Sequence, residues 1–131
     1  MIVLDTHVWV WWVASPERLS SSAKERIETE MGEAPVYVSS ISCWEVSLLV
    51  KKGRLELTLD VEDWIARSES LPFVLFTPVD NQIAVLSNRL PGQFHEDPAD
   101  RIIAATASVL GATLVTKDRK LRDYPHVETF W

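Results

Sequence analysis

Short, continuous apolar runs alternate with longer segments in which apolar residues recur at helical spacing. Runs of three or four such residues are typical of parallel strands that are buried on both faces. Five segments therefore predict strands, at Ile2–Leu4, Val36–Val38, Phe73–Phe76, Thr113–Thr116 and Val127–Phe130. Alternation of strands with helices favours an α/β fold, in three layers α/β/α around a mostly parallel central sheet.

Capping and stop signals mark most of the expected helices. Serines stand where helix starts are expected, Pro98 suits a first helical position, and Gly53 and Gly111 follow apolar periodic segments. The predicted helices are Thr6–Ala14, Ser20–Glu33, Cys43–Lys52, Val61–Ser68, Asn81–Arg89 and the segment from Pro98 to Gly111, with a helical turn at Arg119–Asp123.

The first predicted helix has an unusual composition. From Val8 to Val13 it contains only valine and tryptophan, so a helical wheel leaves no polar face. We therefore expect this helix either to be buried all round in the core or to be covered by another protein chain, because aromatic side chains are favoured as interface anchors.

Length and composition favour one globular domain that spans residues 1–131. The chain has no internal repeat or linker, and 47% of its residues are hydrophobic. A single cysteine, Cys43, and the absence of a signal-peptide pattern predict a cytoplasmic protein. The longest apolar run, Val8–Ala14, is far shorter than the ~20 residues of a membrane span, so no membrane association is expected.

Four acidic residues follow strands or begin helices at positions that a parallel sheet brings to one edge. They are Asp5, Glu45, Asp100 and Asp118, with Glu45 expected in the first turn of its helix. Two like charges ~5 Å apart repel by roughly 3 kcal/mol at an effective dielectric constant of ~20. Such a cluster therefore predicts protonation or a bound cation, and oxygen ligands suit Mg²⁺ or Mn²⁺.

The net charge of −6 disfavours binding of nucleic acid by the chain alone, so a bound cation would be needed to hold a substrate of this class. An acidic protein does not coat nucleic acid by charge alone, whereas a divalent ion attracts phosphate and activates water for phosphodiester hydrolysis. A rim of basic residues would assist: Lys51, Lys52, Arg54, Arg101, Lys117, Arg119, Lys120 and Arg122.

Four segments of the chain resemble the motif set of PIN-domain ribonucleases, in order and at the expected separations. They are Leu4-Asp5-Thr6-His7, Ser42-Cys43-Trp44-Glu45, the segment from Asp97 to Ala105, and Leu114 to Asp118. The resemblance covers essentially the whole chain and is closest to the bacterial VapC-type toxins of toxin–antitoxin modules.

The resemblance implies a PIN-like fold and RNA cleavage that depends on Mg²⁺ or Mn²⁺. It also implies a homodimer and inhibition by a small cognate antitoxin. Carried onto this sequence, it makes Asp5, Glu45, Asp100 and Asp118 the catalytic, metal-binding acids. Supporting positions are Thr116, Thr6 and Asp97, and RNA contacts are expected from Arg101, Lys117, Arg119 and Lys120.

Structural roles compete with these assignments at several positions. Glu45 could simply favour a helix N-terminus, and Asp118 is typical of turns. Asp97 and Asp100 together match a capping box, so Asp97 is interpreted first as a helix cap. His7 and His95 are expected to serve structure or substrate contact instead of metal binding, since hard cations prefer oxygen.

Two other functions remain open from the sequence. A PIN-like module could bind RNA or a protein partner without cleaving, although four intact acids argue against this. A phosphoaspartate protein is the less favoured alternative: Asp5 and Lys117 follow strands as such sites require, but Thr6 and His7 stand where a second acid is needed.

Overall fold

A computed structural model describes all residues from Met1 to Trp131. Its centre is a five-stranded sheet in the order β3-β2-β1-β4-β5, and every neighbouring pair is parallel. The strands are β1 (Ile2–Leu4), β2 (Val36–Ser39), β3 (Val74–Thr77), β4 (Thr113–Val115) and β5 (Thr129–Phe130). The predicted α/β class and mostly parallel sheet are confirmed.

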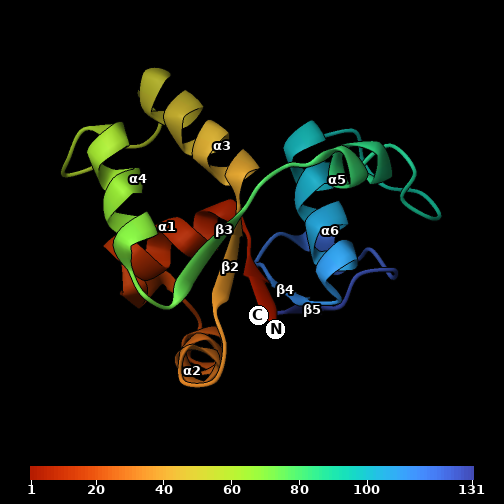
Figure 1. The fold of residues 1–131 in the computed structure, drawn as a ribbon, viewed down its shortest axis with the longest axis horizontal. Coiled ribbons are helices and arrows are strands. Elements are labelled where there is room, and N and C mark those ends of the chain that lie inside the picture. The colour runs from red at the N-terminus through yellow and green to blue at the C-terminus, as the bar shows by residue number, and fades with distance from the viewer.

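Helices connect the strands and cover both faces of the sheet (Figure 1). They are α1 (Thr6–Ala14), the 3₁₀ turn η1 (Pro16–Arg18), α2 (Ser21–Met31), α3 (Ser40–Lys51), α4 (Val61–Ser70), α5 (Asn81–Leu86), α6 (Pro98–Leu110) and α7 (Arg119–Arg122). Gly111 ends α6 in the left-handed conformation, with φ of 62°, which glycine adopts without a steric penalty. None of these helices has the length and apolar character needed to cross a membrane.

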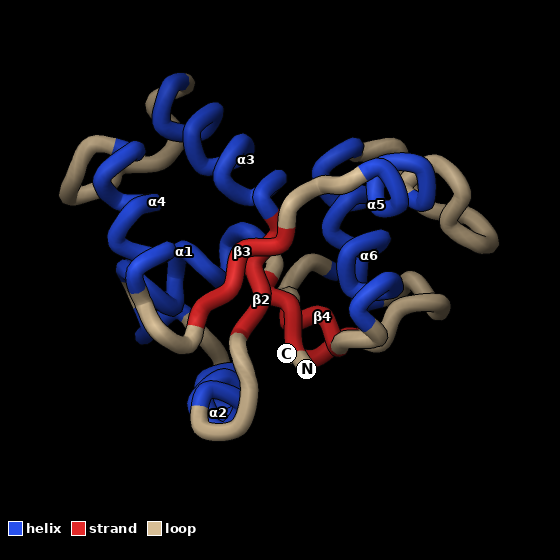
Figure 2. The backbone as a smooth tube through the Cα atoms, in the orientation of Figure 1, coloured by secondary structure: helices blue, strands red, loops and turns tan.

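Alternate residues of β1 point to opposite faces and define two hydrophobic clusters. Ile2 and Leu4 pack in the first cluster, with residues of α1, α2, α3 and α4, whereas Val3 packs in the second, with residues of α6 and of the α7 region. Figure 2 shows these helix groups on either side of the strands. Burial on both faces explains why the central strand β1 is a continuous apolar run, whereas the edge strands β3 and β5 are only partly buried.

The structure corrects several expected boundaries. Helix α3 begins at Ser40, so Glu45 lies in its second turn and not in its first. The predicted helix at 81–89 ends at Leu86, and the last strand is only Thr129–Phe130. These differences fall at element ends, where capping and tertiary hydrogen bonds decide the boundary.

The tryptophan-rich helix α1 is only partly buried, which corrects the expectation of burial all round. Val8, Trp9 and Val10 lie in the core, but Trp11 and Trp12 are half-buried and Val13 is exposed. One side of the helix packs on the sheet, and Trp12 lies against Phe73 at a ring-centroid distance of 5.5 Å.

The strand order creates a switch point beside β1. From β1 the chain moves outward through β2 to β3, and it then crosses back to form β4 and β5 on the other side. Helices that leave the carboxyl ends of β1 and its two neighbours therefore diverge, and ligands of open α/β sheets bind in the crevice so formed.

Candidate active site

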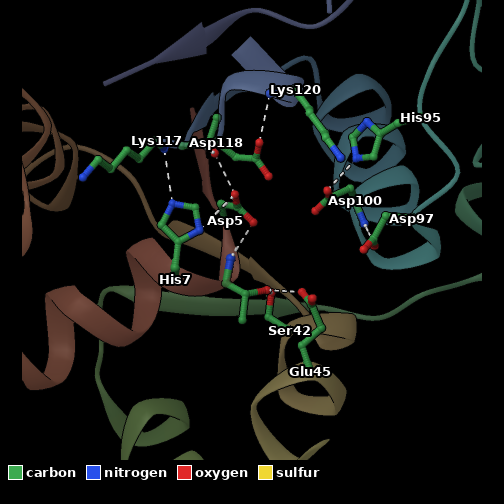
Figure 3. A network of polar contacts seen from close by, with 12 residues as sticks. Asp5, His7, Ser42, Glu45, His95, Asp97, Asp100, Lys117, Asp118 and Lys120 are labelled. Atoms are coloured by element: carbon green, nitrogen blue, oxygen red, sulfur yellow. Dashed lines mark hydrogen bonds and ion pairs between the residues drawn. The ribbon is translucent and has the colours of Figure 1, made fainter. Parts of the chain in front are cut away.

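The crevice is a cavity of about 410 Å³ whose lining includes Asp5, Glu45, Asp97, Asp100 and Asp118. We call it the acidic cavity. The structure thus brings all four predicted acids, and Asp97 with them, around one space, although they come from four separate parts of the chain (Figure 3). The side chains that also line it include Trp11, Arg18 and Arg54.

Asp5 lies at the centre, directly after β1, and is 3% exposed. Its Oδ1 accepts a hydrogen bond from the Thr6 amide at 2.8 Å, and its Oδ2 accepts one from the Thr116 hydroxyl at 2.6 Å. Its own amide donates to the Val115 carbonyl of β4. Burial raises the pKa of Asp5, an effect that nearby His7 and these hydrogen bonds oppose.

Glu45 reaches the cavity from α3 and accepts a hydrogen bond from the Thr6 hydroxyl. The Thr6 oxygen also lies 2.8 Å from the hydroxyl oxygen of Ser42, which is fully buried. When Glu45 is ionised, the single Thr6 proton goes to Glu45, and Ser42 is then the donor to Thr6. Burial raises the pKa of Glu45 to about 7, and the charges of Asp5, Asp100 and Asp97 add to the effect.

Asp100 enters from the first turn of α6. Its amide donates to Asp97 Oδ1 at 3.1 Å, so the predicted cap by Asp97 is confirmed, and its Oδ2 lies 2.6 Å from His95 Nε2. Burial raises the pKa of Asp100 to about 6, opposed by the His95 contact and increased by the charge of Asp5.

Asp118 follows β4 and caps the short helix α7. Its Oδ1 accepts from the Lys120 amide at 2.9 Å, and its amide donates to the Thr116 hydroxyl at 3.0 Å. Its negative charge raises the pKa of Asp5 and of Asp100. Thr116 thereby links the β4 side of the cavity to Asp5.

His7 occupies the mouth of the cavity and has a defined tautomer. Its Nε2 accepts the Lys117 amide at 3.2 Å, so in the neutral ring the proton is on Nδ1, which lies 3.3 Å from Asp5 Oδ2. His95 likewise contacts Asp100. Both histidines thus contact acids of the cavity.

The chemistry of the donor set fits a divalent cation. The carboxylates are oxygen donors, and in Asp5, Glu45 and Asp100 burial and the charge of a neighbouring acid disfavour the charged form, a penalty that a cation relieves. No three or more His, Cys, Asp or Glu side chains lie close enough together to form a complete set of metal ligands. The carboxylates are instead held by hydroxyl, amide and imidazole partners around the open space.

The predicted basic rim divides into residues near the cavity and residues elsewhere. Arg54 lines the acidic cavity, whereas Arg119 and Arg122 line a larger cavity of about 580 Å³ beside Trp131. Asp123 is the only acid that lines this second cavity, and its carboxylate lies 3.7 Å from Arg119 Nε. The second cavity therefore contains no cluster of carboxylates. Arg101 donates from Nε to the His95 carbonyl at 2.9 Å, which ties α6 to the preceding loop.

Sequence reasoning missed three residues of the site. Arg18 lies in η1, and Trp11 was assigned only to packing or to an interface. Ser42 was interpreted, with Ser39 and Ser40, as one of three possible helix caps, of which Ser39 is the observed one. No local pattern marks Arg18. A serine three positions before Glu45, on the same helical face, was the available signal for Ser42.

Comparison with known proteins identifies the family. Residues 2–127 match the model of the PIN domain. The chain is 40% identical over 126 residues to "Ribonuclease VapC22" of Mycobacterium tuberculosis, which covers 95% of this chain and 92% of that protein.

Solved structures with 20–24% identity share the fold. One is a chain of VapBC2 from Rickettsia felis, solved bound to a DNA fragment from its promoter. The match has a TM-score of 0.73 and 20% identity, and it covers 99% of this chain and 98% of that one. FitAcB of Neisseria gonorrhoeae matches with a TM-score of 0.61 and 24% identity, over 99% of this chain and 96% of that one. With the acidic cavity at the sheet's switch point, these matches establish that this chain belongs to the PIN-domain family, among the VapC-type ribonucleases.

Proposed function

We propose that the chain is a metal-dependent endoribonuclease and the toxin of a toxin–antitoxin pair. The observation that carries the proposal is the gathering of Asp5, Glu45, Asp100 and Asp118 around the acidic cavity. A cluster of one buried and three partly buried carboxylates that repel one another is costly for a fold unless it serves a cation. Membership of the VapC-type ribonucleases supports RNA as the substrate.

In this proposal the four acids hold Mg²⁺ or Mn²⁺. The bound cation supplies a water of lowered pKa and positive charge at the phosphate. Thr116 and Thr6 orient Asp5 and Glu45 through the hydrogen bonds described above, because each hydroxyl fixes one carboxylate oxygen. Asp97 acts first as the cap that orients the start of α6 and the Asp100 amide.

Attraction of RNA to an acidic chain requires local positive charge. Arg18 and Arg54 line the acidic cavity, and Lys117 precedes Asp118 at its edge. The exposed residues Arg119 and Lys120 continue this positive segment along α7. We assign them to the outer path of the RNA, because phosphate contacts depend on charge more than on precise geometry.

The phosphoaspartate alternative receives no support from the position of Lys117. A phosphoacceptor site needs its lysine next to the carboxylate, but the Lys117 ammonium lies over the Trp11 ring, 5.8 Å from the ring centroid, and makes no ion pair with Asp5. The remaining alternative is RNA or partner binding without cleavage.

The proposed partners are a small antitoxin and a second copy of the chain. The support for the antitoxin is the likeness to chains solved within VapBC and FitAB complexes. Light scattering after size-exclusion chromatography tests the homodimer, for which we expect twice the mass of one chain. A monomer at all concentrations would contradict that part of the proposal.

The decisive experiment incubates purified protein with a panel of cellular RNAs in Mg²⁺, in Mn²⁺ or in chelator. We expect discrete products with either metal and none with chelator or with the Asp5→Asn variant. RNA binding without products under every metal condition would favour the non-cleaving module. Products that persist in Asp5→Asn would identify a contaminating nuclease or refute the assigned site.

A further inference from the structure

Trp11 has a position that its two tryptophan neighbours do not share. Trp9 is fully buried in the core and Trp12 packs against Phe73, whereas Trp11 is half-buried and lines the acidic cavity. An indole ring at the edge of a cavity of carboxylates keeps apolar surface in water, at a cost of about 25 cal/mol per Å². Core packing alone does not require that placement.

Two cations approach the same indole from different parts of the chain. The guanidinium carbon of Arg18, in η1, lies 5.2 Å from the ring centroid, and Lys117 Nζ, from the segment after β4, lies 5.8 Å from it. Neither side chain makes an ion pair, although the acidic cavity is adjacent. Contacts of this kind at exposed sites are worth only about 0.5–1 kcal/mol, so a phosphate can recruit both cations at little cost.

The remaining neighbours hold the indole in place. His7 meets it edge-on with ring centroids 4.9 Å apart, and Trp131 lies 6.1 Å away. His7 is in turn fixed by the Lys117 amide and lies 3.3 Å from Asp5, at the centre of the proposed metal site (Figure 3). Trp11 is therefore an aromatic surface tied to the candidate catalytic acid through one intervening side chain.

We propose that Trp11 is the stacking surface for one nucleobase of a single-stranded RNA, next to the phosphate that enters the acidic cavity. Arg18 and Lys117 then hold the phosphates that flank this base. The inference rests on the proposed function, since it concerns the substrate of the same site. Single-stranded RNA offers unpaired bases to aromatic side chains, and stacking tolerates any base, so Trp11 fixes the position of the strand more than its sequence.

The test measures binding of a labelled RNA hexanucleotide by fluorescence anisotropy in the Asp5→Asn background, which prevents cleavage. Every variant in the series carries Asp5→Asn, so the effect of this substitution on metal binding and on RNA affinity is common to all of them, and the variants are compared only with one another. In this background Trp11→Leu is expected to weaken binding by about 5- to 150-fold, the range for loss of one stacked base. Trp11→Phe is expected to retain most of the affinity, and Trp12→Leu, the matched control on the same helix, to change it little.

A series of hexanucleotides with one abasic residue at each position identifies the base. At one position the missing base should weaken binding to the parent as much as Trp11→Leu does, and the two losses should not add. Arg18→Gln and Lys117→Gln should instead weaken binding to intact and abasic RNA alike, and each should reduce the slope of log affinity against log salt by about 0.7.

The outcomes separate this inference from the proposed function. Unchanged binding by Trp11→Leu, or losses that add at every abasic position, would overturn the stacking role while leaving cleavage by the natural protein intact. If Trp11→Leu and the abasic series give the expected losses but the natural protein cleaves no RNA, the nuclease proposal would be refuted and the stacking role of Trp11 would stand. Absence of RNA binding by every form would overturn both, and affinity lost equally in Trp11→Phe and Trp11→Leu would assign the ring to packing.

Discussion

The two walls of the acidic cavity hold their carboxylates by different means. On the wall formed by β1, α1, α3 and the carboxyl end of β4, the buried hydroxyls of Thr116, Thr6 and Ser42 position Asp5 and Glu45. On the α6 wall, Asp100 is held by the imidazole of His95 and by its own amide at the start of the helix. The hydroxyls of the first wall are uncharged and buried in the core, with His7 as a further contact of Asp5 at 3.3 Å, whereas the second wall depends on a half-buried histidine in a loop.

This difference predicts which changes disturb folding and which disturb only the site. A buried hydroxyl that loses its acceptor, or an acceptor that loses its hydroxyl, leaves a polar atom without a partner away from water. A half-buried imidazole can be replaced by water at small cost. We therefore expect substitutions on the first wall to affect stability and activity together, and those on the α6 wall to affect mainly activity.

The largest expected effect belongs to Asp5→Asn, at the centre of the first wall. We expect cleavage to fall by about 10³-fold or more, since charge stabilisation by a bound metal is worth several kcal/mol. The metal-free variant should nevertheless melt at a higher temperature than the natural protein, by a few degrees, because one repelling charge is gone. RNA cleavage rates and differential scanning fluorimetry in chelator measure the two effects, and an unchanged or lower melting temperature would contradict the repulsive cluster.

The second prediction concerns pH and metal and involves both walls. Since the pKa values of Glu45 and Asp100 are raised to about 7 and about 6, the folded metal-free protein binds more protons than the unfolded chain between about pH 4 and pH 7. Its free energy of unfolding should therefore decrease as the pH rises through this window. We expect a lower Tm at about pH 8 than at about pH 5.5, and a rise on addition of Mg²⁺ at the higher pH.

Comparison with Glu45→Gln isolates the contribution of the site from that of the other acids in the chain. This variant removes one carboxyl whose pKa is raised, so its Tm should fall less steeply over the same pH range. Equal slopes in the two proteins would show that the cavity does not carry the pH dependence.

The third prediction compares one partner from each wall, Thr116→Val and His95→Ala. Loss of an outer-shell partner is expected to reduce activity by about 10- to 100-fold in both. Thr116→Val should also lower the free energy of unfolding by about 1–3 kcal/mol, because Asp5 Oδ2 and the Asp118 amide both lose a partner. Thr116→Ser should restore most of the activity and most of the free energy of unfolding. Urea unfolding measures the change in stability of each variant, and we expect only a small change for His95→Ala.

The smallest effect is expected at Asp97, where substitutions can distinguish a helix-capping role from a metal-binding role. Asp97→Asn keeps an oxygen that can accept the Asp100 amide, so a capping role predicts near-natural stability and activity within a few-fold. Asp97→Ala should cost about 1 kcal/mol of stability. A large loss of metal-dependent cleavage in Asp97→Asn, with stability retained, would instead place Asp97 among the metal ligands.

The sequence predicted the fold well because its signals are local. Continuous apolar runs, Pro98 at the start of α6 and Gly111 at its end are recognisable from neighbouring residues alone, and the observed elements match them closely. The start of α3 was misplaced by three residues because several serines compete to cap it, and a hydrogen bond to Ser39 decides among them.

The alternation of strands and helices and the positions of the acids after buried strands can be predicted from the amino-acid sequence, since both follow from periodicity and chain order. The resemblance also named Thr116 and Thr6 as supporting positions, but the three-dimensional contacts were needed to show which carboxylate each hydroxyl holds and which cations lie beside the cavity. Thr116 and Asp5 are 111 residues apart, and Arg18, Trp11 and Lys117 come from three separate segments. No pattern of neighbouring residues encodes such contacts, because they form only when parallel strands bring their carboxyl ends to one edge of the sheet.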